Sequence, residues 1–244
     1  MLAASVFDSS KMVWLVAAAI SAACVVIGSQ VSADTLAGPA EGLCDKTATS
    51  ASVRGIFKTI ASERATLLIA GSCLFFGFGD GIGGSGFWPQ MNKLGLSSIV
   101  SAGIVQALMS CARLLGVQVW SKFIDRFDAR TLLIYSLIAS GVLFGFFGAF
   151  DSLAVSLLFW LARIAVLSIY FSALEKLILG LAIAKEKGAT LISAASTITA
   201  IGAIVGSGIL SLTSTYIPGH MGFAFVVGGV CTIVAGGLLG KYEI

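Results

Sequence analysis

Long apolar runs separated by short polar stretches dominate the chain. The runs carry few charges and lack the alternation of apolar and polar residues that marks a half-buried strand. A run of about 20 apolar residues suits a membrane-spanning helix, because backbone groups in lipid must be satisfied within the segment itself. The expected fold is all-α, a polytopic membrane helical bundle of about seven transmembrane helices. The predicted spans are residues 12–31, 66–88, 99–120, 131–150, 153–173, 190–212 and 221–239.

Composition agrees with a chain whose surroundings are lipid. Of its 244 residues, 57% are hydrophobic and 11% are charged, and the mean hydropathy is +1.01. A typical soluble domain carries about 25% charged residues. The net charge of +3 is small and no basic stripe accompanies it. We therefore expect the lipid bilayer as a partner and no nucleic acid.

Residues that usually carry catalysis or bind metals are sparse. The five cysteines form no Cys-x-x-Cys pair, and the single histidine is His220. Clusters of thiolates and imidazoles that hold zinc or haem are therefore missing. No set of serine, histidine and aspartate converges on one span either. We expect no metal, no cofactor and no enzyme activity.

The spacing of the runs divides the chain into three parts. Residues 1–31 hold the first span, residues 32–65 form a polar segment, and residues 66–244 form a six-helix bundle. Within the polar segment, residues 53–60 suit either an amphipathic helix on the membrane surface or an ordinary linker. The small residues after the first span leave two interpretations of it, a retained helix or a cleaved signal peptide.

The distribution of lysine and arginine predicts the orientation. Eleven of them lie in segment 32–65, in the polar stretches 121–130 and 175–188, and at the C-terminus, whereas the opposite side has only Lys11 and Lys93. Cytoplasmic loops carry the excess of positive charge. The N-terminus is therefore expected outside and the C-terminus in the cytoplasm. A cleaved signal peptide would put segment 32–65 on the wrong side, which favours the retained helix.

The stretch 121–130 is a short, charge-dense link between two spans. It holds three cations and two carboxylates in ten residues, and so many charges cannot lie in hydrocarbon. We expect a tight turn at the membrane surface. The turn resembles motif A of the major facilitator superfamily, Gly-x-Leu-Ala-Asp-Arg-x-Gly-Arg-Arg, in which Asp125, Arg126 and Arg130 take matching positions. Ser121 replaces the first glycine of the motif, Asp128 replaces the second, and Ala129 replaces an arginine.

Four further stretches resemble that family in the same order along the chain. They match the aspartate-to-proline spacing of a first helix, the arginine of motif B, the charged turn before a fifth helix, and the antiporter motif C. The usual Gln-Gly of motif B and the proline of motif C are replaced. The stretches are Asp80 with Pro89, Phe159-Trp160-Leu161-Ala162-Arg163, Lys185-Glu186-Lys187-Gly188-Ala189, and Gly202-x-x-x-Gly206-Ser207-Gly208.

The resemblance covers the six-helix bundle and implies one half of a transporter, similar to a C-terminal half with one preceding helix. A complete carrier has two such halves with the solute site between them. The chain would then need a partner membrane chain or a second copy. The resemblance also implies that Asp125, Arg126 and Arg130 form a gating latch. The alternative is a solvated turn whose cations only set the topology.

Polar residues inside the spans are the candidates for chemistry. Asp80 could couple transport to protons or cations, or it could belong to a structural ion pair or cap a helix unwound by its glycines. Its candidate partner is Arg113. Arg163 could bind an anionic solute or pair with Asp80 or Asp125. Gln106 could line a cavity or bond across helices. The spacing of Gly202 and Gly206 predicts tight helix packing.

Two functions fit these features. The first is a secondary-transporter module that moves a small solute, driven by protons or cations, with a partner half or as a dimer. The second is a structural or assembly subunit that reuses the scaffold in a larger membrane complex without transporting anything. A seven-helix receptor fits less well, because the last two spans contain no Asn-Pro-x-x-Tyr or Cys-Trp-x-Pro.

The predicted orientation can be tested at residue 50, which lies in the polar segment. We expect a Ser50→Cys substitution, made in a chain with its native cysteines replaced, to resist membrane-impermeant maleimides added to intact cells. Permeabilised cells provide the control, because the same cysteine should then react. Labelling of residue 50 from outside would reverse the topology.

Overall fold

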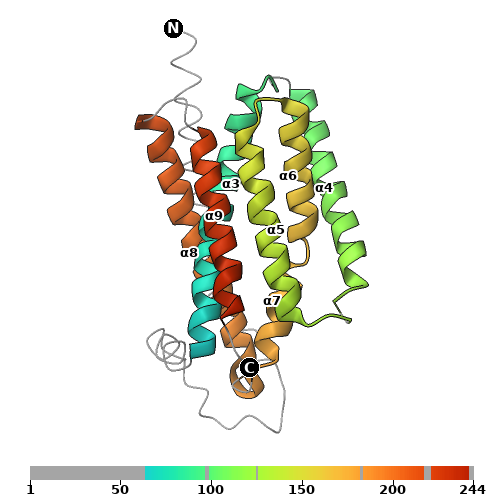
Figure 1. Ribbon diagram of the computed structural model, residues 1–244, viewed down its shortest axis with the longest axis vertical. Helices are drawn as coiled ribbons and strands as arrows, with labels where there is room; N and C mark the ends of the chain where they lie inside the picture. The colour runs from blue at the N-terminus through green and yellow to red at the C-terminus, as the bar shows by residue number, and fades with distance from the viewer. Residues whose placement is uncertain (1–63, 97–98, 125, 182–183, 217–220, 242–244) are drawn as a thin grey trace, which may run out of the picture. The chain divides into compact units, whose positions relative to one another are not determined.

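The computed structural model describes residues 64–96, 99–124, 126–181, 184–216 and 221–241, and this part of the chain is helical without any strand (Figure 1). All of it lies in one compact unit, residues 52–244. The expected all-α fold class is confirmed here. The helices are α3 (Arg64–Lys93), α4 (Ile99–Ser121), α5 (Ala129–Ala149), α6 (Leu153–Leu167), α7 (Tyr170–Leu179), α8 (Ala184–Tyr216) and α9 (Met221–Gly240).

Six segments of the described chain are long and apolar enough to cross a membrane, with α6 and α7 together forming one of them. They correspond to the last six predicted spans and indicate a multi-pass integral membrane protein. The first predicted span, 12–31, and most of the polar segment 32–65 lie outside the described residues. Residues 64 and 65, assigned above to that segment, already belong to α3.

Helix α3 is longer than predicted and does not unwind at its glycines. The prediction ended this span at residue 88, but the helix continues through Pro89 to Lys93. A proline removes one intrahelical hydrogen bond, and the remaining turns still form the helix. Because α3 is continuous around Asp80, the possibility that Asp80 caps an unwound segment is wrong.

The fifth predicted span is broken, and the sixth starts early. A continuous helix was expected over residues 153–173, but α6 ends at Leu167 and α7 begins at Tyr170. At the break the Ser168 hydroxyl donates to the Ala165 carbonyl at 2.7 Å, an interaction that competes with the helical backbone ladder. Residues 185–188 were expected as a charged turn, yet they belong to the first turns of α8, where lysine and glutamate are good helix formers.

The described helices pack in a pattern that occurs twice. Helix α3 packs on α8 and α9, α6 and α7 together pack on α4 and α5, and α5 packs on α9. If α3 is exchanged with α6–α7, α4 with α8, and α5 with α9, these principal contacts map onto themselves. The first set is α3, α4 and α5, and the second set is α6–α7, α8 and α9. Because successive spans alternate in direction and each set contains three spans, the second set runs opposite to the first. In Figure 1, α4 and α8 lie at opposite sides of the bundle.

Glycines bring α3 and α8 into backbone contact. Gly77 and Gly81 on α3 face Gly202 and Gly206 on α8, and a side chain at any of the four would overlap the backbone of the facing helix. At Gly206 the overlapping atom would be the Phe78 carbonyl oxygen. Small residues permit such an approach, and dispersion forces between the backbones then hold the helices together. Gly202 and Gly206 thus lie where tight packing was predicted.

Two buried apolar clusters fill the bundle above and below its middle. One includes Phe76 and Tyr170, and the other includes Phe87, Phe147 and Trp160. Along α3, the first cluster ends at Phe76 and the second begins at Ile82. Asp80 lies between them, so the only carboxylate on α3 is placed at the junction of the two clusters.

The backbone contact of α3 with α8 predicts different outcomes for two glycines on α8. We expect Gly206→Ala to lower the free energy of unfolding by about 1–3 kcal/mol, because the new methyl group must push the helices apart. Gly208→Ala is the matched control, since nothing lies within 4 Å of its added carbon atom. It should be neutral or stabilise by up to about 1 kcal/mol. Denaturant titration in detergent micelles measures both, and equal effects would contradict the packing.

Candidate functional site

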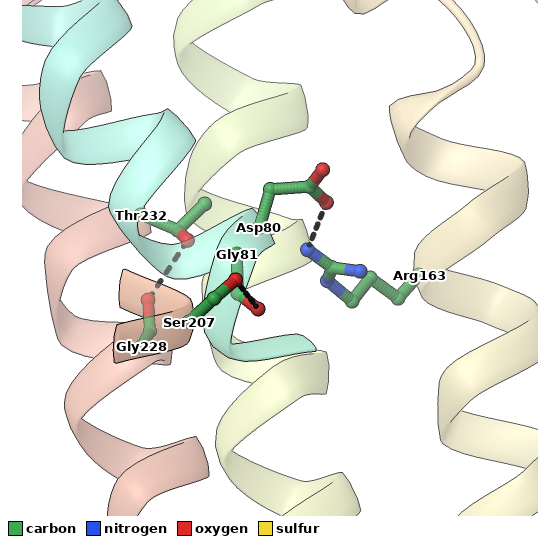
Figure 2. Close-up of polar contacts among 6 residues, drawn as sticks. All are labelled: Asp80, Gly81, Arg163, Ser207, Gly228 and Thr232. Carbon is green, nitrogen blue, oxygen red and sulfur yellow. Dashed lines mark hydrogen bonds and ion pairs between the residues drawn. The ribbon is translucent and has the colours of Figure 1, made fainter. Parts of the chain in front are cut away.

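An ion pair inside the membrane-spanning region joins α3 to α6. Nη2 of Arg163 donates to Oδ1 of Asp80 at 3.0 Å (Figure 2). The Arg163 side chain is 3% exposed and that of Asp80 is 51% exposed. The arginine is thus enclosed in the bundle, whereas the carboxylate lies at the edge of open space. Of the partners considered for Asp80, the structure selects Arg163 and not Arg113.

Two aromatic rings enclose the guanidinium group of Arg163. Its central carbon lies 4.5 Å from the centroid of the Phe144 ring and 4.8 Å from that of Trp160. Aromatic ring faces attract cations, and the attraction is stronger where water is excluded. The Nε atom of Arg163 has no hydrogen-bond acceptor among the described residues. One carboxylate and two rings therefore stabilise a nearly buried cation.

Neighbouring glycines determine where Asp80 points. Gly79 lies against the α9 backbone at Gly228, and Gly81 lies against α8. Asp80 occupies the remaining side of α3, and Gly84, one turn further, has nothing within 4 Å. Figure 2 shows Asp80 directed at Arg163, while Ser207 and Thr232 lie on the other side of α3. Gly79 and Gly81 thus pack two sides of α3 against α9 and α8, and the carboxylate points away from both.

A cavity of about 390 Å³ opens beside the ion pair. Residues of α3, α4, α6, the α6–α7 break and α7 line it, and its charged members are Asp80, Arg113 and Arg163. Most other lining residues are apolar or aromatic, which is typical of sites for small molecules. Its volume is also within the usual range of about 300–1,000 Å³. The cavity could therefore hold a small solute against a charged pair.

One face of α4 carries the other two predicted polar residues. Gln106, Ser110 and Arg113 are four and three residues apart, so they share a face of the helix, and all three are exposed. Arg113 lines the cavity, and its side chain makes no hydrogen bond or ion pair with a described residue. Gln106 does not line the cavity; its backbone carbonyl accepts from the Ser110 hydroxyl at 3.1 Å. Thus Gln106 lies outside the group that surrounds Asp80.

A second set of polar contacts ties α3 to α8 behind Asp80. The Ser85 hydroxyl donates to the Ser207 hydroxyl at 2.8 Å, and Ser207 donates to the Gly81 carbonyl at 3.1 Å. These bonds lie one turn from Asp80 and hold α3 against α8. Sequence analysis had noted Ser207 only as part of a motif, because the spacing along α8 says nothing of which serine on α3 it meets.

In the 121–130 turn, the described residues act mainly as helix caps. Arg130 donates from Nε to the Leu239 carbonyl at 3.0 Å and from Nη2 to the Gly240 carbonyl at 2.9 Å, which satisfies the end of α9. Oδ2 of Asp128 accepts from the backbone nitrogen of Thr131 at 3.1 Å and so caps α5.

The other two predicted gating residues are not drawn into these contacts. Arg126 is exposed; its backbone nitrogen donates to the Phe123 carbonyl at 3.0 Å, and its side chain bonds to no described residue. Asp125 lies outside the described residues, so the structure does not test its pairing with Arg163. The turn is also held from α7, because Nζ of Lys176 donates to the Ile124 carbonyl at 2.7 Å. Arg130 is thus the gating candidate with defined contacts.

The aromatic enclosure of Arg163 is the part of the site that sequence analysis missed. Trp160 lies three residues before Arg163 and therefore on the same face of α6, a spacing that could have indicated the contact. Phe144 comes from α5, and nothing in the sequence links it to Arg163. Among the described residues no group of three or more histidine, cysteine, aspartate or glutamate side chains gathers to hold a metal ion.

Comparison with known proteins does not assign the chain to a family. No protein-family model matches the chain, and a search of curated proteins finds no match either. The ion pair, the cavity and the helix arrangement are the features that bear on function.

The unequal burial of the ion pair predicts which substitution is more damaging. Asp80→Ala should lower the free energy of unfolding by about 1–3 kcal/mol, because it leaves a buried cation without its counterion. Arg163→Met should cost less, since water in the cavity can still solvate Asp80. The double variant should recover stability relative to Asp80→Ala alone. Denaturant titration in micelles measures all three, and a double variant as unstable as the sum of the singles would contradict the pairing.

Proposed function

We propose that the chain is a secondary-transporter module, one half of a carrier similar to the major facilitator superfamily. It would move a small solute, driven by protons or cations, together with a partner half or a second copy. The observation that carries this proposal is the Asp80–Arg163 ion pair beside a cavity within the spans. In this arrangement the 121–130 turn and the C-terminus face the cytoplasm.

A charged pair in the middle of a bundle supports transport because it is expensive to maintain. Ionisable groups within spans usually face cavities and mark the paths of ions or substrates. Asp80 is half exposed and can exchange a proton or cation with the cavity, whereas Arg163 is nearly buried against the rings of Phe144 and Trp160. Neutralising Asp80 would leave Arg163 without a counterion and so favour a different arrangement of α3 and α6.

The exposed face of α4 supports the need for a partner. An arginine within a span cannot face hydrocarbon without a large cost, yet Arg113 is exposed together with Gln106 and Ser110. A second helical bundle over this face would enclose the three residues and close the cavity. The repeated packing pattern of the two three-helix sets also supports the proposal, because many transporters are built from repeats of inverted topology.

A non-transporting assembly subunit is the second candidate, and the 121–130 turn is the observation that favours it. Arg130 and Asp128 cap helix ends there, which is a static role, and Ser121, Asp128 and Ala129 depart from the transporter motif. In the transport proposal, the bonds from Arg130 to the end of α9 form the closed state of the latch. In the subunit proposal they never open.

Purification in mild detergent distinguishes the two candidates. A carrier should emerge as a dimer or with a chain that supplies about five or more helices, since two halves form one solute site. Stable association with a large enzyme complex and no transport activity would favour the subunit. A monodisperse monomer would contradict the shared-site proposal.

Uptake into proteoliposomes tests the role of Asp80. We expect Asp80→Asn to abolish solute accumulation driven by an imposed proton or sodium gradient, because the amide keeps the hydrogen bond to Arg163 but cannot ionise. Purification and assembly should be unaffected. Asp151→Asn is the matched control, since Asp151 is exposed in the turn between α5 and α6 and lies outside the cavity. Undiminished uptake by Asp80→Asn would remove Asp80 from the coupling mechanism.

A further inference from the structure

We propose that the cavity binds organic monoanions, small carboxylates with an apolar or aromatic body, and that Arg113 and Arg163 recognise the negative charge. This inference rests on the proposed function, because it takes the same cavity as the place where the solute binds. It goes further by stating the chemical class of that solute.

The charges around the cavity do not cancel. Two guanidinium groups and one carboxylate line it, and Asp80 is paired with Arg163. Arg113 has no ion-pair partner among the described residues and faces the cavity. One positive charge is therefore left over, and a monoanion would balance it. A cation would instead meet the unpaired charge of Arg113.

The cavity also has more hydrogen-bond donors than acceptors, which likewise favours an anion. A guanidinium group has five N–H donors and no acceptor. Arg163 donates one hydrogen bond, to Asp80, and its Nε has no acceptor among the described residues. Arg113 donates none to them. A ligand that supplies acceptor oxygens satisfies this excess of donors, and the planar fork of arginine matches a carboxylate well.

The rest of the cavity wall specifies the body of the ligand. Phe76, Met109, Trp160 and Phe171 contribute to the lining and present apolar or aromatic surface. An inorganic anion would leave this surface in contact with water, whereas an apolar body attached to a carboxylate would cover it. The combination of a cationic end and an apolar wall therefore favours organic anions over phosphate or sulfate.

Asp80 limits the charge of the ligand. It already occupies one donor of Arg163, so a bound carboxylate shares this arginine with Asp80 or displaces it. With Asp80 ionised, a dianion would leave the cavity with an excess negative charge in a setting of low polarity. With Asp80 neutral, one further negative charge would be accommodated. We infer that removal of the Asp80 charge strengthens anion binding.

Three probes of nearly equal shape but different charge test whether the cavity prefers anions. Benzoate is an anion, benzamide is neutral, and benzamidine is a cation. With the full chain in detergent micelles at pH 7, we expect benzoate to raise the melting temperature and to bind by isothermal titration calorimetry, and the other two to have little effect. Stabilisation by benzamidine alone, equal effects of all three probes, or no effect of benzoate at concentrations up to tens of millimolar would each overturn the inference.

Variants then locate the site. Arg113→Gln should weaken benzoate binding by about 10- to 100-fold, because it removes one charge-assisted hydrogen bond to the carboxylate. Lys122→Gln is the control, because Lys122 is an exposed cation in the 121–130 turn and does not line the cavity. Asp80→Asn should strengthen benzoate binding. Unchanged affinity in a folded Arg113→Gln variant, or weaker binding in Asp80→Asn, would refute this assignment.

The same preparation distinguishes this inference from the proposed function. Benzoate binding without gradient-driven uptake of benzoate into proteoliposomes that hold the chain together with any co-purifying partner chain would overturn transport and leave the anion site intact. Gradient-driven uptake of a neutral or cationic solute without benzoate binding would overturn the anion site and leave transport intact.

Discussion

The contact of bare backbones between α3 and its neighbours is the constraint on which the rest of the site depends. Glycines on α3 meet backbone atoms of α8 and α9, so these helices approach more closely than side chains would permit. A helix wedged in this way cannot rotate about its own axis without collision. The direction of Asp80 is consequently a property of the glycines beside it, and the ion pair with Arg163 follows from that direction.

Membrane surroundings explain why one such pair matters. Between helices in lipid the hydrophobic effect contributes little, because lipid tails are as apolar as leucine side chains. Packing and polar contacts therefore hold the bundle together, and a charge without a partner is far more costly than at a protein surface. Groups on three different helices stabilise the Arg163 cation: the Phe144 ring on α5, the Trp160 ring on α6 and the Asp80 carboxylate on α3.

Sequence analysis could locate the spans but not the faces that they present. The six described spans are found near their predicted positions, since length and hydropathy suffice for that purpose. Helices that are apolar all round do not reveal which side is internal, and for that reason Phe144 could not be linked to Arg163. Arg113 and Arg163 were both plausible partners for Asp80, because only the packing of α6 against its neighbours decides between them. At the break between α6 and α7 the Ser168 hydroxyl bonds to the Ala165 carbonyl, a local contact that hydropathy periodicity does not detect.

The distance along the chain between the two charges has a consequence for biosynthesis. Asp80 and Arg163 are 83 residues apart, so α3 is synthesised and reaches the membrane before its counterion exists. An aspartate at the centre of an inserting helix costs about 2.5–3.5 kcal/mol on the translocon scale. Until α6 follows, α3 therefore enters the bilayer with its carboxylate unpaired or protonated. Arrival of α6 then supplies the counterion of Asp80.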